Sequence, residues 1–204
     1  MAVKALSNGQ APPAAASNTA TPLRLLHAAI ESFADVGYHA TTTREIAARA
    51  KMSPAAVYVH YKSKLQLLKL ISKMGHERAR DTLEAALAVE GTNRDRMHSA
   101  VYAFARWHVD NQTIARVVQY EYRHLPPRDR EVIRRLRRRM QADVAEVVVR
   151  GIEAGEFTTP DPFGAALAIV SMCVDLARWY SDKERRPPNE IGELYAHIAL
   201  KILE

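Results

Sequence analysis

Cysteine is almost absent from this sequence, because Cys173 is the only thiol among 204 residues. A single cysteine excludes an internal disulfide framework and favours a reducing compartment. No stretch approaches the roughly 20 apolar residues that a membrane-spanning helix needs. The N-terminal residues also lack the basic-then-apolar order of a secretory signal. We therefore expect a cytoplasmic protein that does not contact a membrane.

The sequence also lacks the short motifs of several enzyme classes. It contains no nucleophile elbow, no P-loop and no glycine-rich dinucleotide fingerprint. No two histidines are four positions apart, as a helical metal site would require; they are His27, His39, His60, His76, His98, His108, His124 and His197. We expect no metal and no cofactor, and an enzyme is the weakest of three functional alternatives.

Strand-like alternation of apolar and polar residues is missing too. Apolar residues instead recur at helical spacing, first in Leu26, Ile30 and Phe33 after Pro22. Gly37 is placed to end this helix in a left-handed cap. Glycine and proline separate the other helical segments, which we expect at 63–90, 93–111, 113–123, 128–154, 162–182 and 188–203. The prediction is an all-α fold of about nine helices.

Residues 1–21 consist mainly of Ala, Pro, Ser, Asn and Thr and offer little to bury. This composition predicts a disordered N-terminal arm. Lys4 is its only basic residue, which favours a simple tail over an arm that binds a nucleic-acid groove.

Acidic residues are scarce in the first third of the chain. Residues 1–75 contain nine Lys and Arg and three Asp and Glu, a net charge of 9 − 3 = +6. The other residues hold 29 − 9 = 20 basic and 23 − 3 = 20 acidic side chains, which cancel. The whole positive excess therefore lies in the first third, as expected for a segment that meets a polyanion.

Between Thr42 and Tyr61 the sequence predicts two short helices around a tight turn. Thr42 and Glu45 have the spacing of a capping box. Ser53 and Pro54 suit the N-cap and first position of the second helix. Apolar residues at helical spacing turn both helices toward one core, and Ser63 begins a third capped helix; the inward residues are Ile46, Ala47, Ala50, Met52, Val57 and Tyr61. Such a pair, braced by a preceding helix, is a helix-turn-helix, whose outer face fits the DNA major groove.

Several residue groups of this segment resemble the DNA-binding domain of the TetR family (TetR/AcrR type) of transcriptional regulators. They are Thr42-Thr43-Arg44, Ile46-Ala47, Met52-Ser53, Val57-Tyr58 and Lys62-Ser63-Lys64. The resemblance implies a DNA-binding domain at 22–75, with its motif at 42–61. It also implies a larger helical ligand-binding and dimerisation domain at 76–204.

The resemblance assigns roles on a double-stranded DNA operator. Arg44 would read a base edge, most naturally guanine, while polar side chains such as Tyr58 hold phosphates. The DNA-binding set would be Thr42, Thr43, Arg44, Ser53, Pro54, Ala55, Ala56, Tyr58, His60, Tyr61, Lys62 and Lys64. One residue departs from the family pattern: Lys51 stands where the turn usually has glycine, which tolerates a left-handed conformation.

The second domain is rich in aromatic and methionine residues with a few polar groups, which suits a small apolar effector. The candidate ligand-binding residues are Tyr102, Trp107, His108, Tyr120, Glu121, Met172, Asp175, Arg178 and Trp179. Any one of them could instead be packed core. Asp175 and Arg178, three positions apart, face either a ligand or each other.

The basic run from Arg134 to Arg139 is either a solvated helix face or a phosphate clamp for a coenzyme A thioester. The Glu121-Tyr122-Arg123 and Arg178-Trp179-Tyr180 segments are similar to a TetR branch that controls lipid and sterol breakdown in actinobacteria. That similarity implies an acyl-CoA or a steroid-like lipid as effector.

The last two helices are the expected dimer interface. Small residues near Gly164 and Ala168 permit close helix approach, and an apolar stripe follows the final helix: Ile191, Leu194, Tyr195, Ile198 and Ile202. In the family such helices form a two-fold interface, which suits a palindromic operator. We therefore expect a homodimeric repressor that an effector releases from DNA; activation is the other possible sign. A helical protein-interaction adaptor is the main alternative, but it leaves the charge of the first third unexplained.

Overall fold

The computed structural model describes the backbone of residues 14–181 and 186–204, and the side chains of these residues from position 21 onward. The described residues form nine α-helices and one short 3-10 helix without any strand, which confirms the all-α prediction. The elements are α1 (Ala14–Ala40), α2 (Thr43–Arg49), α3 (Pro54–His60), α4 (Lys64–Leu87), α5 (Asn93–Asp110), α6 (Gln112–Tyr120), η2 (Tyr122–His124), α7 (Pro127–Glu153), α8 (Pro162–Trp179) and α9 (Pro188–Ile202).

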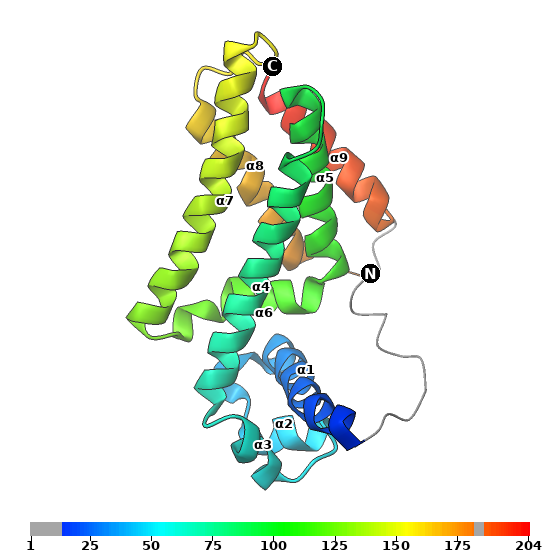
Figure 1. Ribbon diagram of the computed structural model, residues 1–204, viewed down its shortest axis with the longest axis vertical. Coiled ribbons are helices and arrows are strands. Elements are labelled where there is room, and N and C mark those ends of the chain that lie inside the picture. Colours follow the sequence, from blue (N-terminus) through cyan, green and yellow to red (C-terminus); the bar gives the residue numbers. More distant parts are fainter. Residues whose placement is uncertain (1–13, 182–185) are drawn as a thin grey trace.

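Figure 1 shows an elongated molecule with α1, α2 and α3 at one end. Helix α4 runs from this end into the bundle that α5, α7, α8 and α9 form, and the C-terminus lies at the opposite end. One continuous helix therefore joins the two parts of the molecule.

Helix α1 begins earlier than the sequence analysis predicted. The expected arm at 1–21 falls largely on residues outside those described, but its last part, from Ala14, already belongs to α1, and Pro22 lies inside the helix. Alanine is the strongest helix former, and a helix that already exists downstream removes the cost of nucleation. The Ala-rich composition was therefore misread as disorder at these positions.

Gly37 ends the regular part of α1, as predicted. Its φ of +83° is positive, but its ψ of 164° places it outside the left-handed helical region. This backbone region is essentially restricted to glycine. The chain turns at Gly37, and Tyr38 and His39 leave the axis of α1 toward the second part of the molecule.

The core under α1 to α3 does not stop at a domain boundary. Phe33 of α1, Ile46 of α2 and Val57 of α3 are buried in one cluster with Val117 of α6 and Ile133 of α7. The predicted division at residue 75 falls inside α4. The two parts therefore share a helix and a continuous apolar core.

A second cluster fills the bundle of α4, α5, α7, α8 and α9. Cys173 of α8 is fully buried in it and is a packing residue; burial raises the pKa of its thiol. Helix α9 packs closely along α5 because Gly192 has no side chain: a Cβ there would lie 2.8 Å from the ring of Tyr102. Helix α8 is long and apolar enough to cross a membrane, but a third of that window is buried inside the protein, where α8 packs against α5, α6 and α7.

Candidate nucleic-acid interface and adjoining cavity

Helix α2 begins with the predicted capping box. The Thr42 N–H donates to Glu45 Oε2 at 2.6 Å, and the Glu45 N–H donates to Thr42 Oγ1 at 3.2 Å. These hydrogen bonds lower the pKa of Glu45. The box fixes the first turn of α2 and leaves the exposed Arg44 side chain without a partner among the described residues.

Helix α3 also begins where predicted, but its cap differs. Ser53 has the extended backbone of an N-cap residue, and its side chain makes no capping hydrogen bond. A capping hydroxyl would accept a hydrogen bond from the Ala56 N–H. Here that N–H donates to the Ser53 carbonyl instead, at 3.0 Å. The exposed hydroxyl of Ser53 is therefore available to an outside partner.

The outward side of α3 is the most exposed apolar face of this end of the molecule. Val57 is fully buried, whereas Tyr58 is 59% exposed and Val59 is 76% exposed. Pro54 and Ala55 are exposed as well. The sequence analysis omitted Val59, although its position two residues after the inward Val57 places it on the opposite face of the helix.

Two arginines fix α2 and the turn against α1. Arg49 of α2 forms ion pairs with Asp35 at 2.6 Å and Glu31 at 3.4 Å. Arg24 donates from Nη2 to the carbonyl of Ala50 at 2.6 Å. The helix-turn-helix is thereby held rigidly on α1.

The turn itself contains Lys51 in the left-handed conformation, with a φ of 55°. A residue other than glycine costs roughly 1–2 kcal/mol in this region. Lys51 is exposed and lies in the turn that leads into α3.

Two of the predicted DNA-binding residues have structural roles instead. Lys64 donates from Nζ to the carbonyls of Tyr38 and Thr41, both at 2.6 Å, and of His39 at 3.3 Å. Its three protons are thus committed inside the protein. Tyr61 is buried, and its hydroxyl donates to the Pro22 carbonyl at 2.9 Å. Sequence spacing could not predict these partners, because they come from α1.

The charges that remain at this end are positive. All three acidic residues of the described part before position 76 are engaged, since Glu31 and Asp35 pair with Arg49 and Glu45 belongs to the capping box. In the same described segment, three exposed cations have no partner: Arg44, Lys51 and Lys62. His60 is partly exposed, and Thr43 shares a hydrogen bond of 3.1 Å with the Tyr58 hydroxyl.

A polar junction joins this end to the bundle. Beyond Gly37, the Tyr38 N–H donates to Glu121 Oε2 at 3.0 Å. The His39 and His124 rings share a hydrogen bond of 2.9 Å, and the Tyr38 ring stacks on His124 with centroids 5.7 Å apart. Glu121, which was predicted to bind a ligand, therefore holds the two parts of the molecule together.

The bundle contains a cavity of about 350 Å³ between α4, α5, α6, α7 and α8. Three predicted ligand-binding residues line it: Trp107, His108 and Asp175. The other six do not line it; they are Tyr102, Tyr120, Glu121, Met172, Arg178 and Trp179. Asp175 pairs with Arg178 through two hydrogen bonds of 2.8 Å, so these two residues contact each other, as one of the two alternatives predicted.

Polar residues outside the predicted ligand-binding set also line the cavity, and one of them, Arg137, belongs to the basic run. They are His76, Gln119, Arg137, Gln141 and Ser171. On α8 the lining residues Leu167, Val170, Ser171 and Val174 recur at helical spacing, one face away from the buried Ile169 and Cys173. This second stripe is visible in the sequence, but the first stripe is more apolar and masks it.

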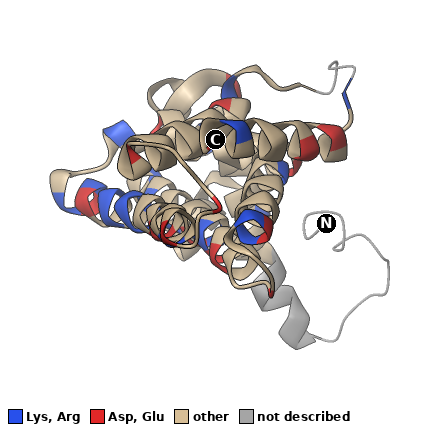
Figure 2. Ribbon diagram, turned by 90° about the horizontal axis from the view of Figure 1, so that it is seen from above, with Lys and Arg blue, Asp and Glu red and all other residues tan. Residues whose placement is uncertain are grey.

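The basic run divides between solvent and cavity. Arg134 and Arg138 pair with Glu131, and Arg139 pairs with Asp143. Figure 2 shows basic and acidic residues interspersed along the helices of the bundle. The prediction of a solvated, balanced face describes these residues, whereas Arg137 alone among them lines the cavity.

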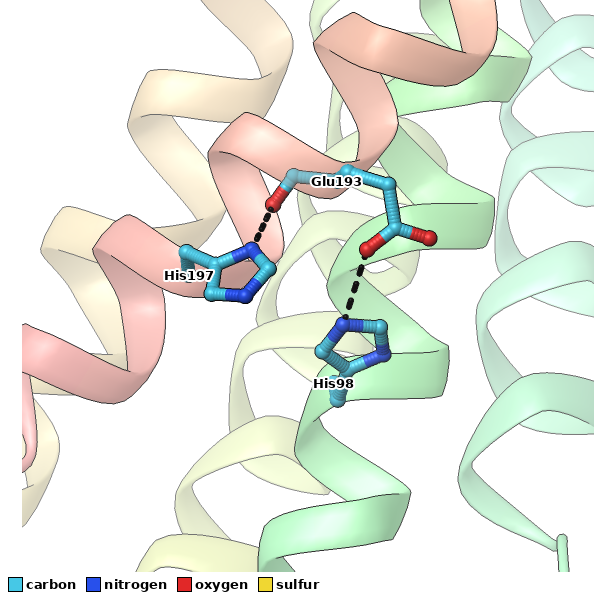
Figure 3. Close-up of side chains that lie close together, drawn as sticks. All are labelled: His98, Glu193 and His197. Atoms are coloured by element: carbon cyan, nitrogen blue, oxygen red, sulfur yellow. Dashed lines mark hydrogen bonds and ion pairs between the residues drawn. The ribbon is translucent and has the colours of Figure 1, made fainter.

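A third group of polar side chains lies on the surface between α5 and α9. The ligand atoms of His98, Glu193 and His197 lie within 4.8 Å of one another. Figure 3 shows these side chains pointing toward one another from two helices. His98 Nε2 lies 3.1 Å from Glu193 Oε2, and His197 Nδ1 donates to the Glu193 carbonyl at 2.7 Å. Sequence spacing could not reveal this group, because folding brings His98 of α5 to Glu193 and His197 of α9.

An all-α chain with a helix-turn-helix at a basic end and a cavity in a helical bundle has the architecture of a DNA-binding transcriptional regulator. Two family profiles match it: "Bacterial regulatory proteins, tetR family" over residues 25–71, and "Tetracyclin repressor-like, C-terminal domain" over residues 90–203. The chain belongs to the TetR family of transcriptional regulators.

Solved and curated relatives agree with this assignment. A bacterial regulatory protein of the tetR family from Rhodococcus RHA1 is 42% identical, with a TM-score of 0.84 over 90% of this chain and 96% of that one. The transcriptional activator FasR of Mycolicibacterium smegmatis is 40% identical over 81 residues, which span 40% of this chain and 37% of FasR. AibR, solved with isovaleryl coenzyme A and operator DNA, shares the fold at 19% identity, with a TM-score of 0.78 over 87% of this chain and 97% of that one.

Proposed function

We propose that this protein is a homodimeric, ligand-responsive repressor that acts in the cytoplasm and leaves a palindromic operator when a small apolar effector enters the bundle. One observation carries the DNA-binding part: the outward face of α3 lies beside three unpaired cations, while every acidic group of that end is engaged. A polyanion with a groove wide enough for a helix fits such a surface.

The exposed residues divide into readers and anchors. Arg44 is the base reader, because its side chain is free at the start of α2 and long enough to reach a guanine edge. Pro54, Ala55 and Val59 are short or apolar and suit contacts with thymine methyl groups. The remaining polar residues hold the phosphate backbone: Thr42, Thr43, Lys51, Ser53, Tyr58, His60 and Lys62.

A second copy of the chain is the partner that suits the outer sides of α8 and α9. Phe163 and Leu167 of α8 and Ile198 of α9 are exposed large apolar residues, and two thirds of the apolar window of α8 is not fully buried. Part of the predicted stripe on α9 packs internally, since Ile191 is buried in the bundle. A two-fold dimer would place two α3 helices about one DNA turn, or a small multiple, apart.

Effector control would act through α4. Gly75, His76 and Ala79 of α4 line the cavity, while Leu67, Leu68 and Ile71 of the same helix are buried under the helix-turn-helix. A ligand that binds one position of α4 more tightly than another shifts the population of DNA-binding dimers. AibR, which is described with both an acyl-coenzyme A and operator DNA, supports this arrangement in the same fold.

Selection of bound sequences from a random duplex library tests the DNA-binding function. We expect a palindromic site whose affinity falls about 10³-fold or more between about 50 and 200 mM salt, as phosphate contacts dictate. An adaptor or an enzyme would select no sequence. A reporter gene behind the selected site gives the sign of regulation, which is of interest because the relative FasR is an activator.

Arg44→Ala tests the base-reading role. We expect a loss of about 1–3 kcal/mol in binding free energy on the selected site and little change on random duplex DNA. Arg139→Ala is the matched control, because Arg139 is an exposed arginine paired with Asp143 on α7. An equal loss on both duplexes would assign Arg44 to the phosphate backbone instead.

A further inference from the structure

We propose that the effector is an apolar carboxylic acid whose carboxylate binds Arg137, and that Arg137 transmits this binding to the DNA-binding end. The inference rests on the proposed function of the cavity as the effector site. It names the ligand class and the residue that recognises it.

Arg137 is held inside the bundle by neutral groups only. Its Nε donates to His76 Nε2 at 3.0 Å. Its Nη2 donates to the Val118 carbonyl at 3.2 Å and to Gln119 Oε1 at 3.0 Å. Its guanidinium lies 4.1 Å from the centroid of the Tyr122 ring. Among the described residues, no carboxylate pairs with it, whereas Arg134, Arg138 and Arg139 of the same helix all have one.

This arrangement leaves both charge and hydrogen-bonding capacity for a ligand. A guanidinium carries five N–H donors. Three hydrogen bonds run from Nε and Nη2 to His76, Val118 and Gln119, and the Tyr122 side chain also interacts with the guanidinium, so only part of the donor capacity is used. Partial burial without a counter-ion lowers the pKa of Arg137 through desolvation. A carboxylate would accept from the remaining N–H donors, or form two parallel hydrogen bonds after displacing a neutral acceptor, and would supply the missing negative charge.

The other walls of the cavity define the body of the acid. Phe104, Trp107, Met140 and Val170 are apolar lining residues. Asp175 is the other charged lining residue, and Arg178 already neutralises it. The volume of about 350 Å³ equals that of roughly a dozen liquid water molecules. It accommodates a short aliphatic or aromatic acid.

Arg137 also contacts both connections to the DNA-binding end. His76 belongs to α4, which continues into the helix-turn-helix. Tyr122 belongs to η2, between Glu121 and His124, and these two residues hold Tyr38 and His39 beyond Gly37. A carboxylate that draws the guanidinium toward the cavity weakens its bond to His76 and its contact with Tyr122, so that α4 and η2 are released together.

Binding measurements with matched acids and alcohols test the ligand class. The probes are octanoate and 4-phenylbutyrate, each compared with the alcohol of the same carbon skeleton, by calorimetry and by tryptophan fluorescence, to which the lining residue Trp107 contributes. The variants are Arg137→Gln and Arg137→Lys. Arg135→Gln is the control, because it removes an exposed arginine from the same run. Thermal unfolding of each variant verifies folding.

We expect at least one acid to bind the wild type and Arg135→Gln about tenfold or more tightly than its alcohol, as a charge-assisted pair requires. Arg137→Gln should lose that preference, and Arg137→Lys should retain part of it. The proposal is wrong if neither acid binds below about 1 mM, if the alcohols bind equally well, or if Arg137→Gln keeps the preference.

A DNA-binding assay with the same probes separates this inference from the proposed function. The acid that binds should lower operator affinity of the wild type and of Arg135→Gln, but not of Arg137→Gln. If the protein binds no operator in the absence of any acid, the proposed function fails. If the operator is bound and the acid binds through Arg137 without releasing it, the transmission role of Arg137 is refuted.

A second inference rests on different residues: we infer that His98, Glu193 and His197 bind a divalent transition-metal ion such as Zn²⁺. Imidazole and carboxylate are the donors that zinc takes in sites with an open position. The Nδ1–H of His197 donates a hydrogen bond to the Glu193 carbonyl. This bond orients the ring, as outer-shell bonds do in metal sites, and leaves the lone pair of Nε2 free to coordinate the ion. The ion would join α5 to α9.

Calorimetry with Zn²⁺ on tag-free, chelator-treated protein tests this site. We expect one ion per chain and a rise in the unfolding temperature, because the ion binds the folded state. His98→Ala and Glu193→Gln should each weaken binding about tenfold or more, and His27→Ala, an exposed histidine of α1, should not. Absence of binding, or equal binding by His98→Ala, would refute the inference.

Discussion

At the scale of single residues, two lysines of equal charge have different tasks. Lys64 places its ammonium among the carbonyls of Tyr38, His39 and Thr41, and it lies 4.4 Å from the Tyr38 ring centroid. Burial lowers its pKa. Lys62, two positions earlier, is exposed and has no side-chain partner among the described residues. The first charge holds the start of α4 to the end of α1, and the second is available to DNA.

Replacement of each lysine by methionine should separate these tasks. Lys64→Met leaves carbonyls without a donor, so we expect the free energy of unfolding to fall by about 1–3 kcal/mol in urea titrations. Lys62→Met should leave stability within about 0.5 kcal/mol and reduce the salt dependence of operator binding by about one phosphate contact. The reverse pattern, a stable Lys64→Met with a reduced salt slope, would return Lys64 to the DNA.

Prediction from sequence succeeded at this scale wherever the determinant was local. The capping residues Thr42 and Glu45 were identified correctly, because both partners lie within one helical turn. Lys64 and Tyr61 were assigned to DNA, because their partners on α1 are separated from them by tens of residues. Ser53 was predicted to cap α3, but its carbonyl, and not its hydroxyl, accepts the hydrogen bond from Ala56.

At the scale of elements, α4 and α5 each carry a buried, neutral histidine. His76 Nδ1 donates to the Ser72 carbonyl at 2.7 Å, and His108 Nδ1 donates to the Phe104 carbonyl at 2.8 Å. Burial lowers the pKa of each ring to about 4. Both helices therefore tolerate their histidine only in its uncharged form.

The pKa of each ring is lower in the folded chain than in the unfolded chain, and this difference predicts that acid destabilises the fold. The unfolded chain binds protons at these rings below a pKa of about 6.5, and the folded chain does so only below about 4. The stabilisation is complete above pH 6.5 and is lost as pH falls from there toward 4. Lowering the pH from 7 to 5 should reduce the free energy of unfolding by about 2 kcal/mol for each ring.

Urea unfolding at pH 7 and pH 5 measures this dependence. His108→Gln should flatten the profile, because a neutral side chain replaces the titrating ring, and the exposed control His27→Gln should not. An unchanged slope in His108→Gln would show that the ring is not held neutral.

The helix ends could be predicted because glycine, proline and N-cap residues mark them locally in the sequence. The segments expected at 93–111 and 188–203 became Asn93–Asp110 and Pro188–Ile202. The cavity could not be predicted in the same way. Which stripe of α8 faces it depends on the rotation of α8 against α7, so Met172 was selected. The basic run was considered as a whole, because the sequence does not show that Arg137 alone among its members lines the cavity.

At the scale of the whole molecule, the proposed dimer is the arrangement that gives the two-fold DNA contact. Exposed Phe163 and Ile198 are two of its expected interface residues. Phe163→Asp and Ile198→Asp together should produce monomers in light scattering, because each charge would be buried against an apolar surface.

The control is Val36→Asp, which changes an exposed apolar residue of α1 and should leave the mass unchanged. Operator affinity of the double variant should fall by more than that of the control. A double variant that remains dimeric would place the interface elsewhere.

The continuous core between α1–α3 and α6–α7 limits how this protein can be divided. A fragment that ends at residue 75 would lose the part of the shared apolar cluster that α6 and α7 supply, which includes Val117 and Ile133. Hybrid regulators that combine the DNA-binding end of this protein with the ligand-binding domain of another should therefore include α6 and the start of α7 from this protein. A graft at the apparent seam in α4 would instead produce an aggregation-prone chimera.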